Sequence, residues 1–222
     1  MSHVWAELAA VDVVRRVRRS GPTLGPNRLV CIDGPAGSGK TTLASAIADV
    51  WQAGKPAWQS QVRVLHMDDL FPGWPGLRAG VAKVADTVVG PLGRDETGGY
   101  RRYDWVAGAE AEWVEVPAVD LLVLEGCGSG STTYASSITT LVWVEVPVPV
   151  RLARGIARDG EDLRPEWLAW MVDEEVLFTD ERTRERADLV VVGNDVSDVS
   201  DVSDVSDVSD AGGAGGAGGA DD

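Results

Sequence analysis

The sequence predicts an α/β fold in which helices flank a doubly wound parallel β-sheet, and three patterns carry this prediction. Apolar runs of strand length recur along the chain, stretches with helical spacing of apolar residues separate them, and a glycine-rich loop follows the first run. The length of 222 residues suits one domain of this kind.

Five apolar runs are the expected strands. They are hydrophobic without alternation, as strands covered by helices on both faces should be. The runs span residues 28–33, 62–67, 119–125, 140–146 and 187–192.

Helices are expected before and between these strands, because apolar residues there follow the period of a helix. The expected helices cover residues 1–20, 42–52, 150–158 and 165–178. Residues 72–100 contain many glycines and three prolines, which predicts loops around one short helix near 81–89.

The C-terminal segment has a different composition from the rest of the chain. From Asp195 it consists of five Asp-Val-Ser repeats, three Ala-Gly-Gly repeats and closing aspartates. Such a segment buries too little apolar surface to offset its ordering entropy. We therefore expect one domain over residues 1–194 and a disordered tail over 195–222.

Charge and cysteine content limit the function classes. The tail holds eight aspartates of a chain with net charge −15, and the remainder is still acidic, so nucleic acid and anionic membranes are not expected partners. No run reaches the roughly 18 to 20 apolar residues that cross a bilayer. Cys31 and Cys127 form no CxxC pair, and the N-terminal segment lacks the features of a signal peptide, so a cytoplasmic protein is expected.

The glycine-rich loop matches the pattern GxxxxGK[ST] between a strand and a helix, which is typical of a site for nucleotide phosphates. Its backbone N–H groups would converge on phosphate oxygens, Lys40 would neutralise the β and γ phosphates, and Thr41 would ligate Mg²⁺. ATP and Mg²⁺ are the expected cofactors. The phosphate-binding residues are Gly34, Pro35, Ala36, Gly37, Ser38, Gly39, Lys40, Thr41 and Thr42.

Acidic residues end two of the other expected strands. Glu125 follows an apolar run and is predicted to support the metal, the alternative being an edge carboxylate without a ligand role. Asp68 is predicted as the base that accepts the proton of an acceptor hydroxyl. If strand geometry persists, Asp68 and Asp69 point to opposite sides, so that one faces the phosphates and the other faces the substrate pocket or solvent. Asp69 is assigned as a substrate contact, and either aspartate remains open as the base. His66 is interpreted as a buried histidine that is packed or hydrogen-bonded and is not a catalyst, and Cys127 as a small packing residue and not a nucleophile.

Three arginines recur at helical spacing after the fourth expected strand. Arg151, Arg154 and Arg158 would share one helical face and form a lid that supplies positive charge to a transferring phosphoryl group. The alternative is a stripe that pairs with surface acids.

Together, the segments GPAGSGKTT, MDDLF, LLVLEG and RLARGIARD resemble, in order and spacing, the uridine kinase-like family of P-loop kinases, which includes phosphoribulokinase and bacterial pantothenate kinase. Tyr103, Asp104 and Trp105 are similar to its Tyr-Asp-aromatic motif. Two positions depart from the family pattern. Gly108 stands where uridine kinases have a base-contacting histidine, and the double arginine of the lid reads Arg154-Gly155.

The resemblance implies a nucleoside-kinase type of P-loop NTPase fold with a five-stranded parallel sheet, and phosphoryl transfer from ATP to a hydroxyl of a small molecule, with nucleosides among the candidates. It implies Asp68 as base, Glu125 as metal support, Tyr103 and Asp104 as substrate contacts, and Arg154 and Arg158 as lid residues. Two alternatives remain: a regulatory ATPase without transfer, and a nucleoside monophosphate kinase. The acceptor and the oligomeric state stay open.

Overall fold

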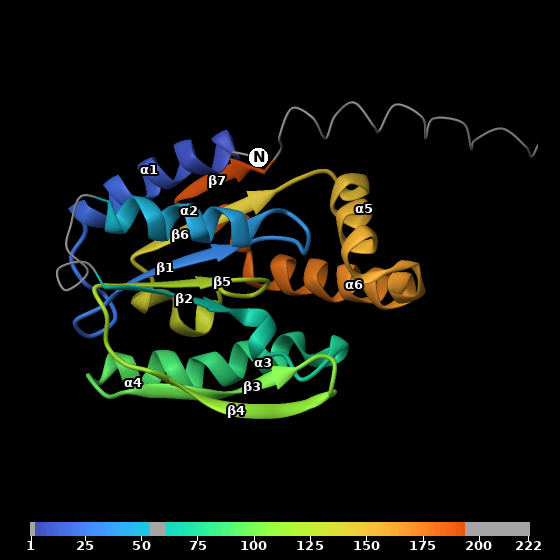
Figure 1. Ribbon diagram of the computed structural model, residues 1–222. Helices are drawn as coiled ribbons and strands as arrows, with labels where there is room; N and C mark the ends of the chain where they lie inside the picture. Colours follow the sequence, from blue (N-terminus) through green and yellow to red (C-terminus); the bar gives the residue numbers. More distant parts are fainter. Residues whose placement is uncertain (1–2, 54–60, 194–222) are drawn as a thin grey trace, which may run out of the picture.

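A computed structural model describes residues 3–53 and 61–193, and the predicted tail lies outside this range. The five expected strands form one parallel sheet in the order β2-β5-β1-β6-β7, which confirms the predicted α/β class (Figure 1). The strands of this sheet are β1 (Arg28–Asp33), β2 (Val62–His66), β5 (Leu121–Glu125), β6 (Thr140–Glu145) and β7 (Leu189–Val192).

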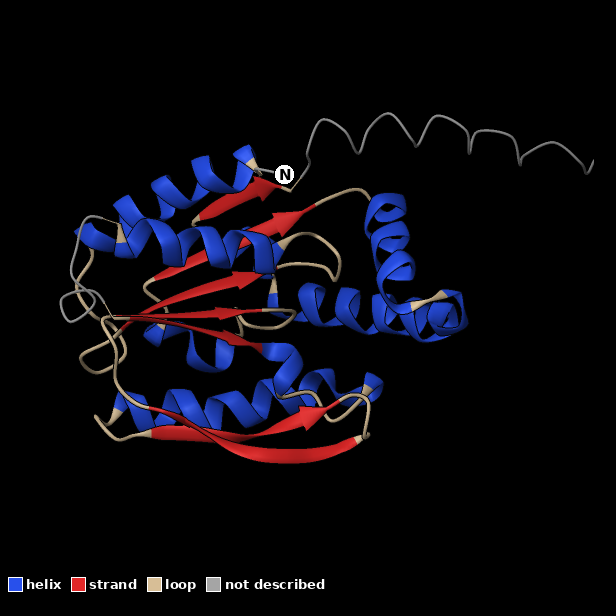
Figure 2. Ribbon diagram, viewed as in Figure 1, coloured by secondary structure: helices blue, strands red, loops and turns tan. Residues whose placement is uncertain are grey.

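Helices cover both faces of the sheet (Figure 2). On one face α1 (Val4–Arg19) and α2 (Lys40–Gln52) pack together over one apolar cluster. Alternate residues of β1 point to the two sides: Val30 belongs to the cluster under α1 and α2, and Cys31 to the cluster on the other face. This alternation explains why the strand sequence is apolar throughout.

The edge strand β7 departs from the expectation of two covered faces. Leu189 and Val191 pack against the cluster under α1 and α2, whereas Val190 and Val192, on the other face, are 46% and 57% exposed. The apolar run therefore predicted the strand correctly and its burial wrongly.

The helix predicted near residues 81–89 is present, but the prediction of loops on both sides of it underestimates the helical length. After a short turn, η3 (Trp74–Gly76), the chain is helical from residue 77 to 93 through α3 (Leu77–Val84), the π-helical turn η4 (Ala85–Val89) and α4 (Gly90–Gly93). Glycine content suggested loops, but Gly80 lies within α3, where a Cβ would lie 2.4 Å from the ring of Phe71. Close packing, and not a turn, explains this glycine.

A β-hairpin was not predicted. Strands β3 (Gly98–Asp104) and β4 (Ala109–Val116) pair antiparallel and pack against the helical segment 77–93. In Figure 1 the hairpin lies outside this segment, away from the main sheet. Charged and apolar residues partly alternate in AEAEWVEV, which is the signal of a half-exposed strand.

The remaining helices lie near the carboxyl ends of the parallel strands. There α5 (Val148–Asp159) and α6 (Arg164–Glu181) extend beyond the sheet edge (Figure 1), followed by α7 (Thr183–Arg186) before β7. Among the described residues there are also the short turns η2 (Met67–Asp69), η5 (Thr132–Ser137) and η6 (Glu161–Leu163). Within residues 3–53 and 61–193, no helix is both long and apolar enough to span a bilayer.

Candidate active site

The phosphate loop connects β1 to α2 as predicted and adopts a compact glycine-dependent conformation. Gly37 and Gly39 have φ angles of 78° and 98°, which other residues rarely adopt. A Cβ at Gly37 would also lie 2.7 Å from the carbonyl oxygen of Arg151. The loop therefore curls at the N-terminus of α2, where backbone N–H groups and the helix dipole favour anions.

Lys40 folds back over this loop. Its Nζ donates to the carbonyl oxygens of Gly34 and Pro35, both at 2.8 Å. Burial alone would lower the pKa of Lys40, but the acidic groups around it raise the pKa overall. The ammonium group therefore stays charged beside the position where phosphates would bind.

Thr41 and Glu125 meet, as expected for a metal site. Thr41 Oγ1 donates to Glu125 Oε1 at 3.0 Å, and Glu125 is only 5% exposed at the end of β5. No group of three or more His, Cys, Asp or Glu suited to a metal occurs in the described part of the chain. One carboxylate and one hydroxyl nevertheless fit Mg²⁺, which commonly takes its other ligands from water and substrate phosphates.

His66 lies beside the same carboxylate. Its Nδ1 is 2.5 Å from Glu125 Oε1, and this hydrogen bond raises the pKa of His66 above its ordinary value. The interpretation of His66 as buried is wrong, since its side chain is 44% exposed. The histidine orients the carboxylate that faces Thr41.

Asp68 and Asp69 have different surroundings, as predicted, but strand geometry is not the cause. The strand ends at His66, and Asp68 and Asp69 lie in the turn η2. Asp68 lines the cleft described below, whereas Asp69 accepts a hydrogen bond from Tyr100 at 3.3 Å. Desolvation and the charge of Glu125 raise the pKa of Asp68, which makes it a stronger proton acceptor.

The three arginines do not form one row. Arg151 is buried in an ion pair with Glu174 of α6, so its predicted place in the lid is wrong. Arg154 donates to the carbonyl oxygens of Gly37 and Gly193 at 3.2 to 3.3 Å. Arg158 pairs with its neighbour Asp159 at 2.7 Å. Helical spacing alone did not reveal the buried acid on α6.

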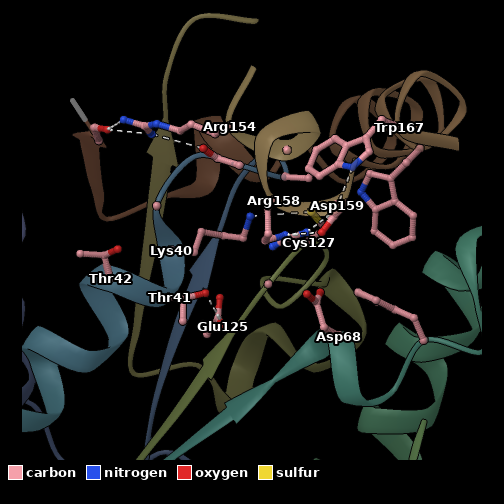
Figure 3. Close-up of a pocket in the computed structure, with 18 of the residues that line it drawn as sticks. Lys40, Thr41, Thr42, Asp68, Glu125, Cys127, Arg154, Arg158, Asp159 and Trp167 are labelled. Atoms are coloured by element: carbon pink, nitrogen blue, oxygen red, sulfur yellow. Dashed lines mark hydrogen bonds and ion pairs between the residues drawn. The ribbon is translucent and has the colours of Figure 1, made fainter. Parts of the chain in front are cut away.

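One cleft of about 860 Å³ brings these groups together (Figure 3). Lys40, Thr41 and Arg154 line one end, and Asp68 lies toward the other. Trp5 also lines the cleft, and so do four further tryptophans, at positions 74, 105, 167 and 170. The ring of Trp74 lies 5.6 to 6.1 Å from each of the other three, edge to face.

Comparisons with known proteins agree with this architecture. A family model for the NACHT domain matches residues 28–69, which contain β1, the phosphate loop, α2 and β2. No curated protein sequence matches the chain. The structure is similar to a protein provisionally named uridine kinase from Bacillus stearothermophilus, with a TM-score of 0.58 and 20% identity over 82% of this chain and 97% of that one.

A second similar structure is a protein provisionally named fructose transport system kinase, from Silicibacter sp. TM1040. The TM-score is 0.56, with 18% identity over 86% of this chain and 98% of that one. This chain has the α/β fold of P-loop NTPases. The fold implied by the resemblance to uridine kinase-like proteins is thereby confirmed.

In this P-loop NTPase fold, the Tyr-Asp-Trp segment at the hairpin tip is only partly at the cleft. Asp104 Oδ1 accepts hydrogen bonds from the backbone of Val106 and Ala107, both at 2.9 Å, and these bonds lower its pKa. Neither Tyr103 nor Asp104 lines the cleft, although both were predicted to contact substrate. Trp105 does line it, and its Nε1 donates to the carbonyl oxygen of Asp68 at 2.8 Å.

Gly155, which replaces the second lid arginine of the family pattern, has a clear structural role. A Cβ there would lie 2.4 Å from Trp167 Cζ2, so the indole packs directly on the backbone of α5. Trp167 is 2% exposed. An aromatic ring therefore occupies the space beside α5 that a side chain at residue 155 would need.

Two buried carboxylates that support the P-loop were missed in the sequence. Asp33 accepts backbone hydrogen bonds from Gly34, Gly128 and Gly130 at 2.7 to 2.9 Å, while burial raises its pKa to about 6. Glu174 accepts one from Ala36 at 2.8 Å. A signal existed for both, because Asp33 ends a strand just before the loop and Glu174 interrupts the apolar face of α6.

Cys127 packs against Glu174 and Lys40. Its Sγ lies 3.4 Å from the carbonyl oxygen of Gly34 and from Glu174 Oε2. Burial raises the pKa of the Cys127 thiol well above its ordinary value. The thiol is therefore protonated at neutral pH, which agrees with the predicted packing role.

Proposed function

We propose that this chain is an ATP- and Mg²⁺-dependent kinase that phosphorylates a hydroxyl group of a small metabolite. The observation that carries the proposal is the cleft itself, in which the phosphate loop and Asp68 line one continuous space. The kinase names of the two similar structures support the same reaction class.

In this proposal the phosphate loop binds the phosphates of the nucleotide. Lys40 provides a charged ammonium group, and the N-terminus of α2 provides backbone N–H groups. Thr41 and Glu125 would hold Mg²⁺, which when bound neutralises charge on the phosphates.

In this proposal Asp68 is the base that acts on the acceptor hydroxyl. The hydroxyl oxygen of the acceptor attacks the γ phosphorus, the bond between that phosphorus and the β–γ bridging oxygen breaks, and ADP leaves with the bonding electrons. The hydroxyl proton passes to the carboxylate of Asp68, whose raised pKa favours this transfer. Arg154 and Arg158 add positive charge along the cleft as the phosphoryl group moves.

The lining of the cleft favours an acceptor without a phosphate group. Around Asp68 the walls are aromatic, with Trp74 and Trp105 in contact with each other. Among the cations that line the cleft, Arg158 is already paired with its neighbour Asp159. A nucleoside monophosphate would need a phosphate partner here, whereas a neutral alcohol with a planar or apolar group, such as a nucleoside, would not.

A screen of ATP consumption with purified protein tests the proposal. The compounds are nucleosides, nucleoside monophosphates, sugars and vitamin alcohols, and mass spectrometry identifies the phosphorylated product. Transfer to a neutral alcohol supports the proposal, while preferred transfer to a monophosphate would support the nucleoside monophosphate kinase. ADP formed without any phosphorylated product would instead identify a regulatory ATPase. Lys40→Ala protein prepared in the same way controls for contaminating kinases.

A further inference from the structure

The N-terminal helix brings an aromatic ring to the phosphate loop. Helix α1 packs on α2, and its first turn lies near the carboxyl end of β7 (Figure 1). A Cβ at Gly39 would lie 3.1 and 3.2 Å from Cζ2 and Cη2 of Trp5, so the six-membered ring of the indole rests on this glycine. Trp5 is half-buried and lines the cleft.

A planar cation borders the same end of the cleft. The guanidinium group of Arg154 reaches the carbonyl oxygens of Gly37 and Gly193. It thus contacts the same loop against which Trp5 packs, and both side chains line the cleft. Figure 3 shows Arg154 beyond Lys40 and Thr42, far from Asp68.

The charge of the lining differs between the two ends. The acidic lining residues Asp68, Glu125 and Asp159 all lie toward the acceptor or the metal position. The end near Trp5 is lined, within the described residues, by neutral or basic groups: His3, Gly39, Thr42, Arg154 and Gly193. This end therefore suits a planar, uncharged and electron-rich group.

We propose that Trp5 and Arg154 form the subsite for the heterocyclic base of the nucleotide. The inference rests on the proposed function, because it takes the ligand of the phosphate loop to be a nucleoside triphosphate. Phosphates held by the loop have an acceptor on the side of Asp68, so the nucleoside lies on the side of Trp5. An indole face and a guanidinium plane both stack on heterocyclic bases.

Calorimetry with the full chain tests the subsite, with MgATP and magnesium tripolyphosphate as the two probes. Tripolyphosphate has the phosphates of ATP but no base. The wild-type protein is expected to bind ATP more tightly, and Trp5→Ala is expected to weaken ATP binding by about 5- to 150-fold while changing tripolyphosphate binding less than about threefold. Trp5→Phe, which keeps an aromatic ring, is expected to retain most of the ATP affinity.

Leu8→Ala is the matched control, because Leu8 lies on the same helix, is 66% exposed and does not line the cleft. It should leave both affinities unchanged. Equal wild-type affinities for the two probes, or an equal loss of both in Trp5→Ala, would overturn the base subsite and leave the proposed kinase intact. Failure of wild-type protein to bind either probe would overturn the proposed function, and the subsite with it.

Discussion

Glu174 of α6 accepts a hydrogen bond from the backbone N–H of Ala36 in the phosphate loop, at 2.8 Å. The same carboxylate forms a buried ion pair with Arg151 of α5. Two helices beyond the sheet edge are thereby fixed to the loop. Glu174→Gln is expected to cost about 3 to 5 kcal/mol of unfolding free energy, because the Arg151 guanidinium would stay buried without a counter-charge. Urea denaturation measures this loss.

The exposed pair of Arg184 and Glu145 provides the control for Glu174→Gln. Its side chains are 56% and 31% exposed, so Arg184→Gln is expected to cost less than about 1 kcal/mol. The double variant Glu174→Gln, Arg151→Met should lose less stability than Glu174→Gln alone, since it removes the unpaired charge. A loss no larger than that of Arg184→Gln would contradict the role given to the buried pair.

Lys40→Ala is expected to lower ATP turnover by a factor of about 10² or more, because the charge beside the β and γ phosphates is lost. Turnover under saturating acceptor and thermal melting of the same protein separate lost catalysis from lost folding. Turnover close to that of the wild type would show that the loop does not hold the reacting phosphates.

Asp68→Asn is expected to leave MgATP affinity nearly unchanged and to lower phosphoryl transfer by about 10² to 10⁴. Asp69→Asn is the matched control, since Asp69 is bonded to Tyr100 and does not line the cleft. The pH profile gives a second readout. The base acts when deprotonated, so kcat should fall as pH drops through a pKa above the ordinary aspartate value, and Asp68→Asn should lose this limb. A larger effect of Asp69→Asn would reassign the base.

Whether Gly155→Ala raises or lowers the free energy of unfolding depends on the contact with Trp167. At a helix position with open space around it, this change would stabilise the folded protein by about 0.5 to 1 kcal/mol. Here the added Cβ would lie 2.4 Å from the indole, so a loss of about 1 to 3 kcal/mol is expected. Adding Trp167→Phe should reduce that loss by making room. Stabilisation by Gly155→Ala, measured by thermal melting, would disprove the contact.

Removal of residues 195–222 is expected to change neither the melting temperature nor the rate of phosphoryl transfer. The segment consists of Asp-Val-Ser and Ala-Gly-Gly repeats, a composition with too few apolar side chains to predict a packed segment. A large fall in melting temperature of the shortened chain would show that these residues pack on the domain.

The sequence predicted those features that depend on local patterns or on strand order. The five apolar runs became the sheet, and the carboxyl ends of adjacent parallel strands brought Glu125 next to the loop residue Thr41. Both results follow from the geometry of parallel strands, in which residues at the same end of neighbouring strands meet. They required no knowledge of side-chain packing.

Features that depend on tertiary partners were missed. Helical spacing placed Arg151 on the face of Arg154, but it could not indicate that Glu174, 23 residues later, would bury and neutralise it. Asp104 matched a motif, yet its carboxylate bonds to the next turn of its own chain. Trp5 reaches the cleft only because α1 packs along α2.

The hydrogen bond from Trp105 to the carbonyl of Asp68 joins the hairpin to the turn that carries the proposed base. Tyr100 adds a second link through Asp69. The tip of the hairpin and this turn are linked. Substitutions at the β3–β4 tip that favour a new acceptor would therefore also move the carboxylate of Asp68, the proposed base. Acceptor choice and catalytic rate are therefore expected to change together in variants of residues 104–108.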